Sequence, residues 1–320
     1  MRNMARKVRP PFKKVLFATD FSVSFEGALQ AAFHICQMNE ASLRILHVRR
    51  TDAAKGTDAS LLQDPGILER RTLQILQQLR ERALQAGVSC TTRLETGEPS
   101  ERILEAIEAE KIDLAILGTS EPRGSKRLAF GPTAGAVMRE ASCPIMTVGP
   151  VAADLIKAHA SRGPVVFATD FHSITRQAVR LAVSYCKSTG VQLHCLHVLP
   201  RTLQSTDGDH TLPEILTYAL KHLVATSAVG INTPVCSVTY GSEVANAIVD
   251  YARQQQASVI FLGVRRASVL PPDDPFPIVF RVITEAPCPV VTIICDTKSG
   301  SESPVDPPSA KSGTPPSHLQ

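Results

Sequence analysis

Phe17-Ala18-Thr19-Asp20-Phe21 returns 150 residues later as Phe167-Ala168-Thr169-Asp170-Phe171. The run Leu46-His47-Val48 returns at the same offset as Leu196-His197-Val198. Three further pairs keep their order at a slightly shorter offset: Gly97 with Gly241, Leu117-Gly118 with Leu262-Gly263, and Cys143-Pro144-Ile145 with Cys288-Pro289-Val290. Five matches in one order indicate that the chain contains a duplicated domain.

Each copy alternates short β-rich apolar runs with longer segments of helical periodicity. In the first copy we expect strands at 15–19, 42–48, 88–95, 113–117 and 144–148, and helices at 24–39, 67–86, 100–110 and 132–141. The helix at 67–86 is expected to end at Gly87 and to bury one face, formed by Leu68, Ile75, Leu76, Leu79 and Ala83. The second copy runs the same course.

Strands that alternate with helices favour an α/β fold in which a parallel sheet is covered by helices on both faces. The sequence therefore predicts two tandem doubly wound domains, at 12–149 and 164–295. An alanine-containing linker with a helical turn is expected at 150–163. Beyond residue 295 the chain is rich in Pro and Ser, and 296–320 is expected to be a disordered tail.

Composition excludes several classes of protein. The chain has 320 residues, 43% of them hydrophobic, which is enough for two ordinary cores. Its formal net charge is only +4, and six of its 34 basic residues lie in the first fourteen positions, at Arg2, Arg6, Lys7, Arg9, Lys13 and Lys14. We interpret 1–11 as a basic, disordered, solvated leader, because neither aromatic interleaving nor an amphipathic repeat accompanies these charges. Binding to nucleic acid or membrane is not expected, and neither a secretory signal nor a spanning helix is evident, so we expect a cytoplasmic protein.

The eight cysteines include no Cys-x-x-Cys pair and have no histidine partner at zinc spacing. They fall in apolar segments, so we expect small buried thiols in a reducing compartment. No metal site is predicted.

Several of these motifs occur together in one known family. Ala-Thr-Asp-Phe-Ser at 18–22, Leu-His-Val at 46–48, Leu-Gly at 117–118 and Cys-Pro-Ile at 143–145 resemble the universal stress protein family, and the duplication is similar to its tandem members. The resemblance covers nearly all of the expected ordered chain. It implies the strand order 3-2-1-4-5, pairing of the two domains through their fifth strands, and a role in stress response. The family contains both ATP-binding and non-binding members.

In the ATP-binding members, the loop after the fourth strand reads Gly-x-x-Gly, a spacer, and then Gly followed by Ser or Thr. Gly118 and Gly131 match the first and last glycine, whereas Glu121 replaces the second glycine and Pro132 the hydroxyl residue. Glycine lets a backbone approach a phosphate, whereas Glu121 adds a negative charge and Pro132 has no N–H group. The resemblance therefore implies a weakened phosphate site.

Basic residues in the same loop offset part of this loss. Arg123, Lys126 and Arg127 could hold a polyphosphate through charge-assisted hydrogen bonds. The alternative is that these long side chains form an ordinary solvated rim, and the sequence leaves both interpretations open.

The loop after the first strand supplies the remaining candidates. The resemblance implies that Asp20, after Thr19, lies near adenine and ribose, and that the backbone of Val48 contacts adenine. The alternative is that Asp20 and Asp170 only accept hydrogen bonds at the start of the following helix. The second copy favours this alternative, because it keeps the aspartate motif although its own phosphate loop is degenerate.

In that second loop, Gly263 is kept, but Arg266, Phe276 and Pro277 replace the other three motif residues. The loop also contains several prolines and two carboxylates, which remove N–H donors and repel phosphate. We expect no nucleotide site in the second domain.

Three functions remain open. The first is a tandem stress-response protein with a weakened site for ATP or another adenine nucleotide in domain 1, and with Mg²⁺ bound only together with nucleotide. The second is a scaffold that acts through unknown protein partners, with or without homodimer formation. The third is a slow ATPase or phosphotransferase. No P-loop, dinucleotide motif or nucleophile elbow is present, and His47 and His197 are expected to be core residues, so no catalytic residue is assigned and a dedicated enzyme is not expected.

Overall fold

The computed structural model describes residues 10–22, 25–50, 65–119, 131–158, 163–171, 175–204, 211–225, 227–228, 230–265 and 278–295. The leader up to residue 9 and the tail expected at 296–320 lie outside these residues.

Strands and helices alternate through the first repeat, as the sequence predicts. In chain order they are β1 (Lys14–Ala18), α1 (Phe25–Asn39), β2 (Ser42–Arg49), α2 (Pro65–Gln85), β3 (Cys90–Thr96), α3 (Pro99–Glu110), β4 (Leu114–Gly118), α4 (Pro132–Glu140) and β5 (Ile145–Val148).

After helix α5 (Pro150–Ala158), the second repeat follows the same course. It comprises β6 (Val165–Ala168), α6 (Thr175–Thr189), β7 (Leu193–Pro200), a short 3-10 helix η2 (Arg201–Leu203), α7 (Thr211–Ala225), β8 (Val235–Gly241), α8 (Val244–Gln254), β9 (Val259–Arg265), α9 (Ile278–Glu285) and β10 (Val290–Cys295).

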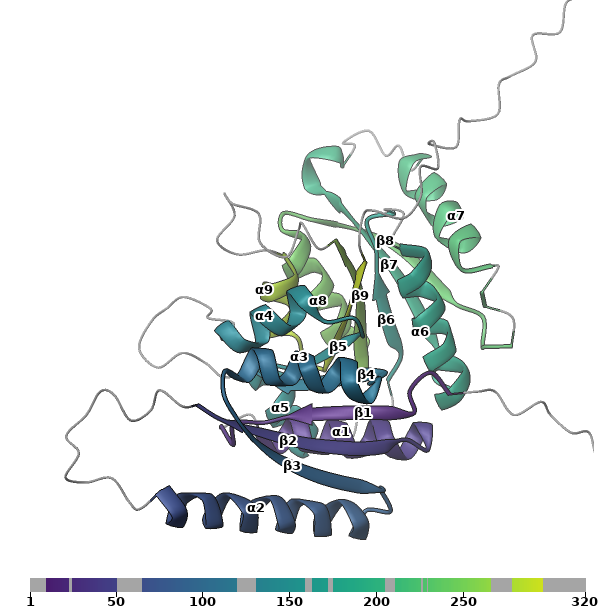
Figure 1. Cartoon of the computed structure of the whole chain (residues 1–320). Helices are drawn as coiled ribbons and strands as arrows, with labels where there is room; N and C mark the ends of the chain where they lie inside the picture. The colour runs from purple at the N-terminus through teal and green to yellow at the C-terminus, as the bar shows by residue number, and fades with distance from the viewer. Residues whose placement is uncertain are drawn as a thin grey trace, which may run out of the picture.

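All ten strands form one continuous sheet, in the order β3-β2-β1-β4-β5-β10-β9-β6-β7-β8 (Figure 1). Each repeat therefore has the order 3-2-1-4-5 that the resemblance implied. Neighbouring strands within a repeat are parallel, whereas β5 and β10 pair antiparallel between the repeats. The two domains thus join through their fifth strands.

Two threonines strengthen this junction symmetrically. The hydroxyl of Thr147 donates a hydrogen bond of 3.2 Å to the backbone oxygen of Val290, and the hydroxyl of Thr292 donates one of 3.2 Å to that of Ile145. Both threonines are fully buried, so each hydroxyl needs such a partner. The reciprocal bonds follow the approximate two-fold relationship of the repeats.

On one face of the sheet, a single hydrophobic core runs through both repeats. It contains buried residues of α1, α2, α5, α6 and α7 together with inward side chains of the strands. Phe12 of the first repeat packs against Tyr185 of the second, with ring centroids 6.5 Å apart. Burying a ring such as Phe12 contributes about 2–3 kcal/mol. On the other face, α3 and α4 cover the first repeat, and α8 and α9 cover the second.

The segment expected as a linker, 150–163, begins with a helix of nine residues rather than a single turn. Ala152 and Ala153 of α5 are buried, and α5 packs against α1. The backbones approach closely there, because a Cβ atom added at Gly27 would lie 2.4 Å from the Cα atom of Ala153. Small residues on both helices permit this contact.

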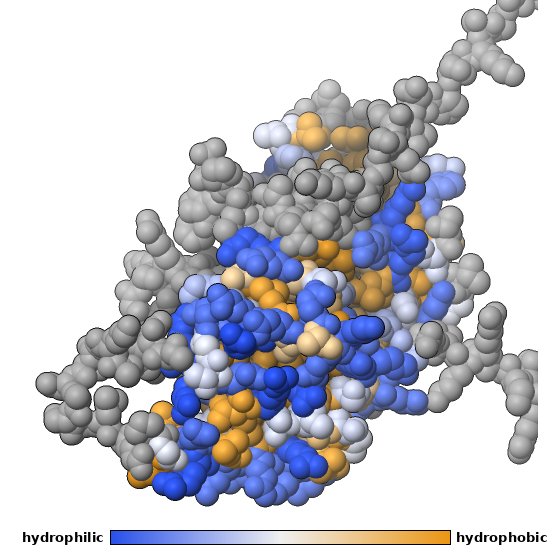
Figure 2. Space-filling view, viewed as in Figure 1, coloured by the Kyte–Doolittle hydropathy of each residue, from blue (hydrophilic) through white to orange (hydrophobic). Residues whose placement is uncertain are grey.

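Helix α2 differs from its expected burial. Leu76, Leu79 and Ala83 are buried as predicted, but Leu68 and Ile75 are 49% and 40% exposed, so their prediction was wrong. Helix α2 packs against the edge strand β3 (Figure 1). Its buried residues, Leu76, Leu79 and Ala83, form only a narrow stripe along the helix. Apolar side chains therefore remain on the surface around α2 (Figure 2). No helix of the described segments is long and apolar enough to cross a membrane.

Candidate functional site

The loop after β1 is fixed by hydrogen bonds of its own residues. The N–H group of Phe21 donates to Oγ1 of Thr19 at 3.0 Å, and the N–H group of Ser22 donates to Oδ1 of Asp20 at 2.9 Å. Phe21 has a φ of 57°, in the left-handed region that few side chains adopt. Asp20 is exposed, so its carboxylate points out of a turn that is already rigid.

His47 holds this loop from the neighbouring strand. Its Nδ1 atom lies 2.8 Å from the backbone oxygen of Thr19, and its ring stacks on Phe21 with centroids 4.5 Å apart. Because a carbonyl oxygen can only accept, Nδ1 carries the proton. His47 is half-buried, so the prediction of a core residue was wrong, and no local sequence pattern indicates its contact with the candidate loop.

The second repeat reproduces this arrangement. Nδ1 of His197 lies 2.8 Å from the backbone oxygen of Thr169, and Phe171, with a φ of 63°, donates to Oγ1 of Thr169 at 2.9 Å. The motif therefore builds the same turn in both domains. The hydrogen bond from Ser22 to Asp20 agrees with the structural alternative for that aspartate, but it occupies only one carboxylate oxygen.

Four of the predicted site residues meet at the carboxyl edge of the first repeat. Ala18 pairs with Leu117, which places Thr19 and Asp20 next to Gly118 at the end of β4. Val48 lies near the end of β2 on the other side of β1 and is half-buried. In a sheet of this topology, ligands bind beyond this edge, between strands 1 and 4.

Gly131 precedes α4, whose N-terminus must lie at the same edge because the helix runs back from the end of β4. Its φ is −58° and its ψ 147°, which any residue adopts. In the described part of the chain, nothing lies within 4 Å of a Cβ atom added there. Neither conformation nor packing requires glycine at this position, whereas the approach of a ligand to the backbone would.

Pro132 begins α4, as predicted, and Thr133 follows it. Thr133 is partly exposed and brings a hydroxyl and an N–H group to the first turn, one residue after the position where the motif expects them. Sequence comparison at fixed spacing missed this residue. Arg123, Lys126 and Arg127, together with Glu121, lie outside the described residues.

The carboxyl edge of the second repeat is built differently. Strand β9 continues through Gly263 to Arg265, and these residues pair with β10 up to Cys295. Gly263 therefore lies inside a strand, whereas Gly118 ends one. Val198, the counterpart of Val48, is buried. The rest of the second loop, 266–277, lies outside the described residues.

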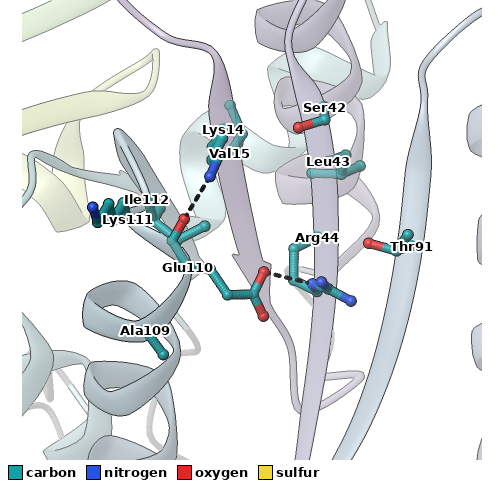
Figure 3. Close-up of a pocket in the computed structure, with 10 residues that line it drawn as sticks. All are labelled: Lys14, Val15, Ser42, Leu43, Arg44, Thr91, Ala109, Glu110, Lys111 and Ile112. Atoms are coloured by element: carbon teal, nitrogen blue, oxygen red, sulfur yellow. Dashed lines mark hydrogen bonds and ion pairs between the residues drawn. The ribbon is translucent and has the colours of Figure 1, made fainter.

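A hollow of about 540 Å³ opens at the opposite edge, at the amino ends of β1, β2 and β3 (Figure 3). Its charged groups bind one another: Arg44 Nε lies 2.9 Å from Glu110 Oε2, and Lys14 Nζ donates to the backbone oxygen of Glu110 at 2.9 Å. It is separate from the predicted crevice. Nowhere in the described chain do three His, Cys, Asp or Glu residues gather in a way that could hold a metal ion.

Known proteins resemble this chain in both sequence and fold. The universal stress protein YxiE of Bacillus subtilis is 30% identical over 148 residues, which span 43% of this chain and 99% of YxiE. A universal stress protein of Methanocaldococcus jannaschii is 29% identical over 142 residues, 43% of this chain and 82% of its own. The crystal structure of a universal stress protein from Archaeoglobus fulgidus covers 87% of this chain and 95% of its own, with a TM-score of 0.65 and 21% identity.

The pattern of the universal stress protein family matches residues 11–149 and again residues 162–293. Each match spans one repeat of five strands, and the second match ends within β10. The chain therefore belongs to the universal stress protein family, with two of its domains in tandem.

Proposed function

We propose that this tandem universal stress protein binds ATP or another adenine nucleotide in its first domain, with reduced affinity, and none in its second. The proposed role is nucleotide-dependent signalling in a cytoplasmic stress response, with binding rather than turnover as its basis.

One observation carries the proposal: the two repeats share the turn after the first strand but differ at the end of the fourth. Gly118 ends β4, Val48 is half-buried, and no described residue lies within 4 Å of a Cβ atom added at Gly131, at the start of α4. In the second repeat, β9 extends to Arg265 and Val198 is buried. Within the described residues, these differences favour a flat ligand at the first repeat over the second.

The residues of the first crevice fit the parts of a nucleotide. The unbonded side of the Asp20 carboxylate would accept hydrogen bonds from ribose or adenine, and the backbone of Val48 would contact adenine. The phosphates would lie at the start of α4, where N–H groups and the helix dipole favour anions. Gly131 would let them approach, and Thr133 would supply the hydroxyl that Pro132 lacks.

Arg123, Lys126 and Arg127 would add positive charge beside these phosphates, and Mg²⁺ would bind only together with the nucleotide. The missing N–H group of Pro132 and the charge of Glu121 would reduce the affinity. Each charge-assisted hydrogen bond contributes about 1.5–3 kcal/mol, so losing one costs roughly tenfold or more in affinity.

Calorimetric titration of the full chain with ATP and Mg²⁺ tests the proposal. The full chain is needed because the two repeats share one core. Asp20→Asn keeps an oxygen for the Ser22 N–H group but removes the charge, and it should weaken binding at least about tenfold. Asp170→Asn, its counterpart in the second domain, should leave binding unchanged. No heat from the wild-type chain at millimolar ATP, or equal losses in both variants, would overturn the proposal.

A second function is favoured by the exposed apolar residues of α7, where Ile215 and Tyr218 are 57% and 65% exposed. Together with the exposed leucines of α2, they offer surfaces for a protein partner or a second copy of the chain. Sedimentation of the full chain with and without ATP tests the second copy: a single monomeric species at high concentration would exclude it.

A further inference from the structure

Two cysteines of the second domain face each other across neighbouring strands. Cys195 of β7 and Cys236 of β8 are paired residues in the parallel register. Neighbouring strands lie about 4.8 Å apart, within the range of about 4.4–6.8 Å between Cα atoms that a disulfide spans. The backbone therefore already holds these two residues close enough to be linked.

The two thiols differ in access. Cys195 is fully buried, whereas Cys236 is half-buried on β8, the outermost strand of the sheet (Figure 1). A small oxidant can reach Cys236 from solvent. The thiol of Cys195 has no access to solvent, so it can react only with a neighbouring group such as an oxidised Cys236.

Their surroundings also give them different reactivity. The neighbouring Cys195 thiol lowers the pKa of the Cys236 thiol; partial burial opposes this shift, and the ammonium group of Lys221 on α7 adds to it. The neighbouring Cys236 thiol and burial raise the pKa of Cys195. The thiolate, which is the nucleophile, therefore forms at Cys236.

The other thiols that the structure describes do not combine partial exposure with a lowered pKa. Burial raises the pKa of Cys36 and of Cys186 to about 12, and that of Cys90 to about 11. In the first domain, the corresponding paired positions hold Ile45 and Thr92. The thiol pair thus belongs to the domain in which no nucleotide site is proposed.

We propose that Cys236 and Cys195 form a site of reversible oxidation by hydroperoxides. The Cys236 thiolate attacks the O–O bond, forms an S–O bond and becomes a sulfenic acid, while the departing alkoxide or hydroxide takes a proton from water. The Cys195 sulfur then attacks the sulfenic sulfur, and its proton leaves with the hydroxyl group as water. Two electrons pass from the two sulfurs to the peroxide, and a dithiol reductant reverses the change.

The disulfide would link the edge strand β8 covalently to β7. Because β8 has only one neighbouring strand, its backbone opens more easily than that of inner strands. Oxidation should therefore slow amide hydrogen exchange in β8, and reduction should restore it.

The test uses the full reduced chain, treated with hydrogen peroxide and digested without reductant. Mass spectrometry should find a peptide pair linked through Cys195 and Cys236, which dithiothreitol separates. In Cys195→Ala, dimedone should instead trap a sulfenic acid at Cys236, and Cys236→Ser should show neither product. Cys90→Ser, a cysteine of the corresponding strand β3, serves as the matched control and should form the same link as wild type.

A second measurement on the wild-type chain does not depend on how the variants fold. Iodoacetamide should modify Cys236 about tenfold faster than Cys90, because the gain in thiolate outweighs the loss of nucleophilicity. A peroxide-induced link between Cys186 and Cys195, or modification of Cys236 no faster than Cys90, would overturn the proposal.

Discussion

The Nδ1 atom of His47 lies 2.8 Å from the backbone oxygen of Thr19, and the second repeat places His197 at the same distance from Thr169. In each domain, a histidine of the second strand thus fixes the loop that ends the first strand. The histidine has the same structural task in both domains, whereas the proposed ligand site exists in only one.

Replacing either histidine should therefore affect stability, but only one replacement should affect binding. His47→Leu and His197→Leu each remove a hydrogen bond to a half-buried carbonyl group, which costs about 1–2 kcal/mol of unfolding free energy. Urea denaturation measures this loss. Calorimetry with ATP should show weaker binding for His47→Leu alone, and equal weakening in both variants would contradict this assignment.

Gly131 tests the approach of a ligand to α4. Gly131 is the N-cap residue of this helix, where Val is less favourable than Gly, so Gly131→Val should lower the unfolding free energy by up to about 1 kcal/mol without unfolding the chain. The added side chain should reduce ATP affinity about tenfold by keeping the phosphates from the backbone, a loss of about 1.4 kcal/mol. Gly131→Ala should show a smaller effect. Unchanged affinity in the valine variant would place the phosphates elsewhere.

Gly149 tests the contact between the domains. A Cβ atom there would lie 2.3 Å from the backbone oxygen of Ile283 in α9, too close for any relaxed contact. Gly149→Ala should therefore lower the unfolding free energy by about 1–3 kcal/mol. Gly131→Ala, which adds the same methyl group where no described residue lies within 4 Å of it, is the control. Equal thermal stability of the two alanine variants would show that the domains do not approach in this way.

The burial of His194 should make the stability of the protein depend on pH. It is 7% exposed, its Nδ1 atom lies 3.1 Å from the Tyr251 hydroxyl, and burial lowers its pKa from 6.5. Below pH 6.5, the unfolded chain binds a proton at this residue that the folded chain does not. The contribution of His194 to stability should therefore fall as the pH drops through 6.5 towards the lowered value. His194→Gln should flatten that slope in urea denaturation series, and an unchanged slope would assign it to other groups.

The periodicities of the two copies predicted the alternation of strands and helices, because such patterns are local. The strand order and the pairing of the fifth strands followed instead from the resemblance to the family. The burial of α2 was harder to predict. Periodicity places Leu68 and Leu76 on related faces of the helix, but the position of strand β3 decides which of the two leucines is buried. The pairing of Cys195 with Cys236 depends on the register of two strands, which residue spacing does not reveal.

The arrangement of the candidate site was predicted in part. Thr19, Asp20, Val48 and Gly118 were proposed from the resemblance of their motifs, and the topology brings them to one edge of the sheet, while their role in binding stays a prediction. His47 and Thr133 were missed, since one acts through a backbone oxygen and the other stands one residue from its expected position. The extension of β9 past Gly263 requires β10 as a partner, so no local signal in the loop indicated it.

One domain of the pair is proposed to bind nucleotide and the other is not. Native mass spectrometry of the full chain with ATP and Mg²⁺ tests this difference because it counts the bound molecules. We expect a single ATP for each chain, retained in Asp170→Asn and lost in Asp20→Asn. Two bound nucleotides, or none at millimolar ATP, would contradict it.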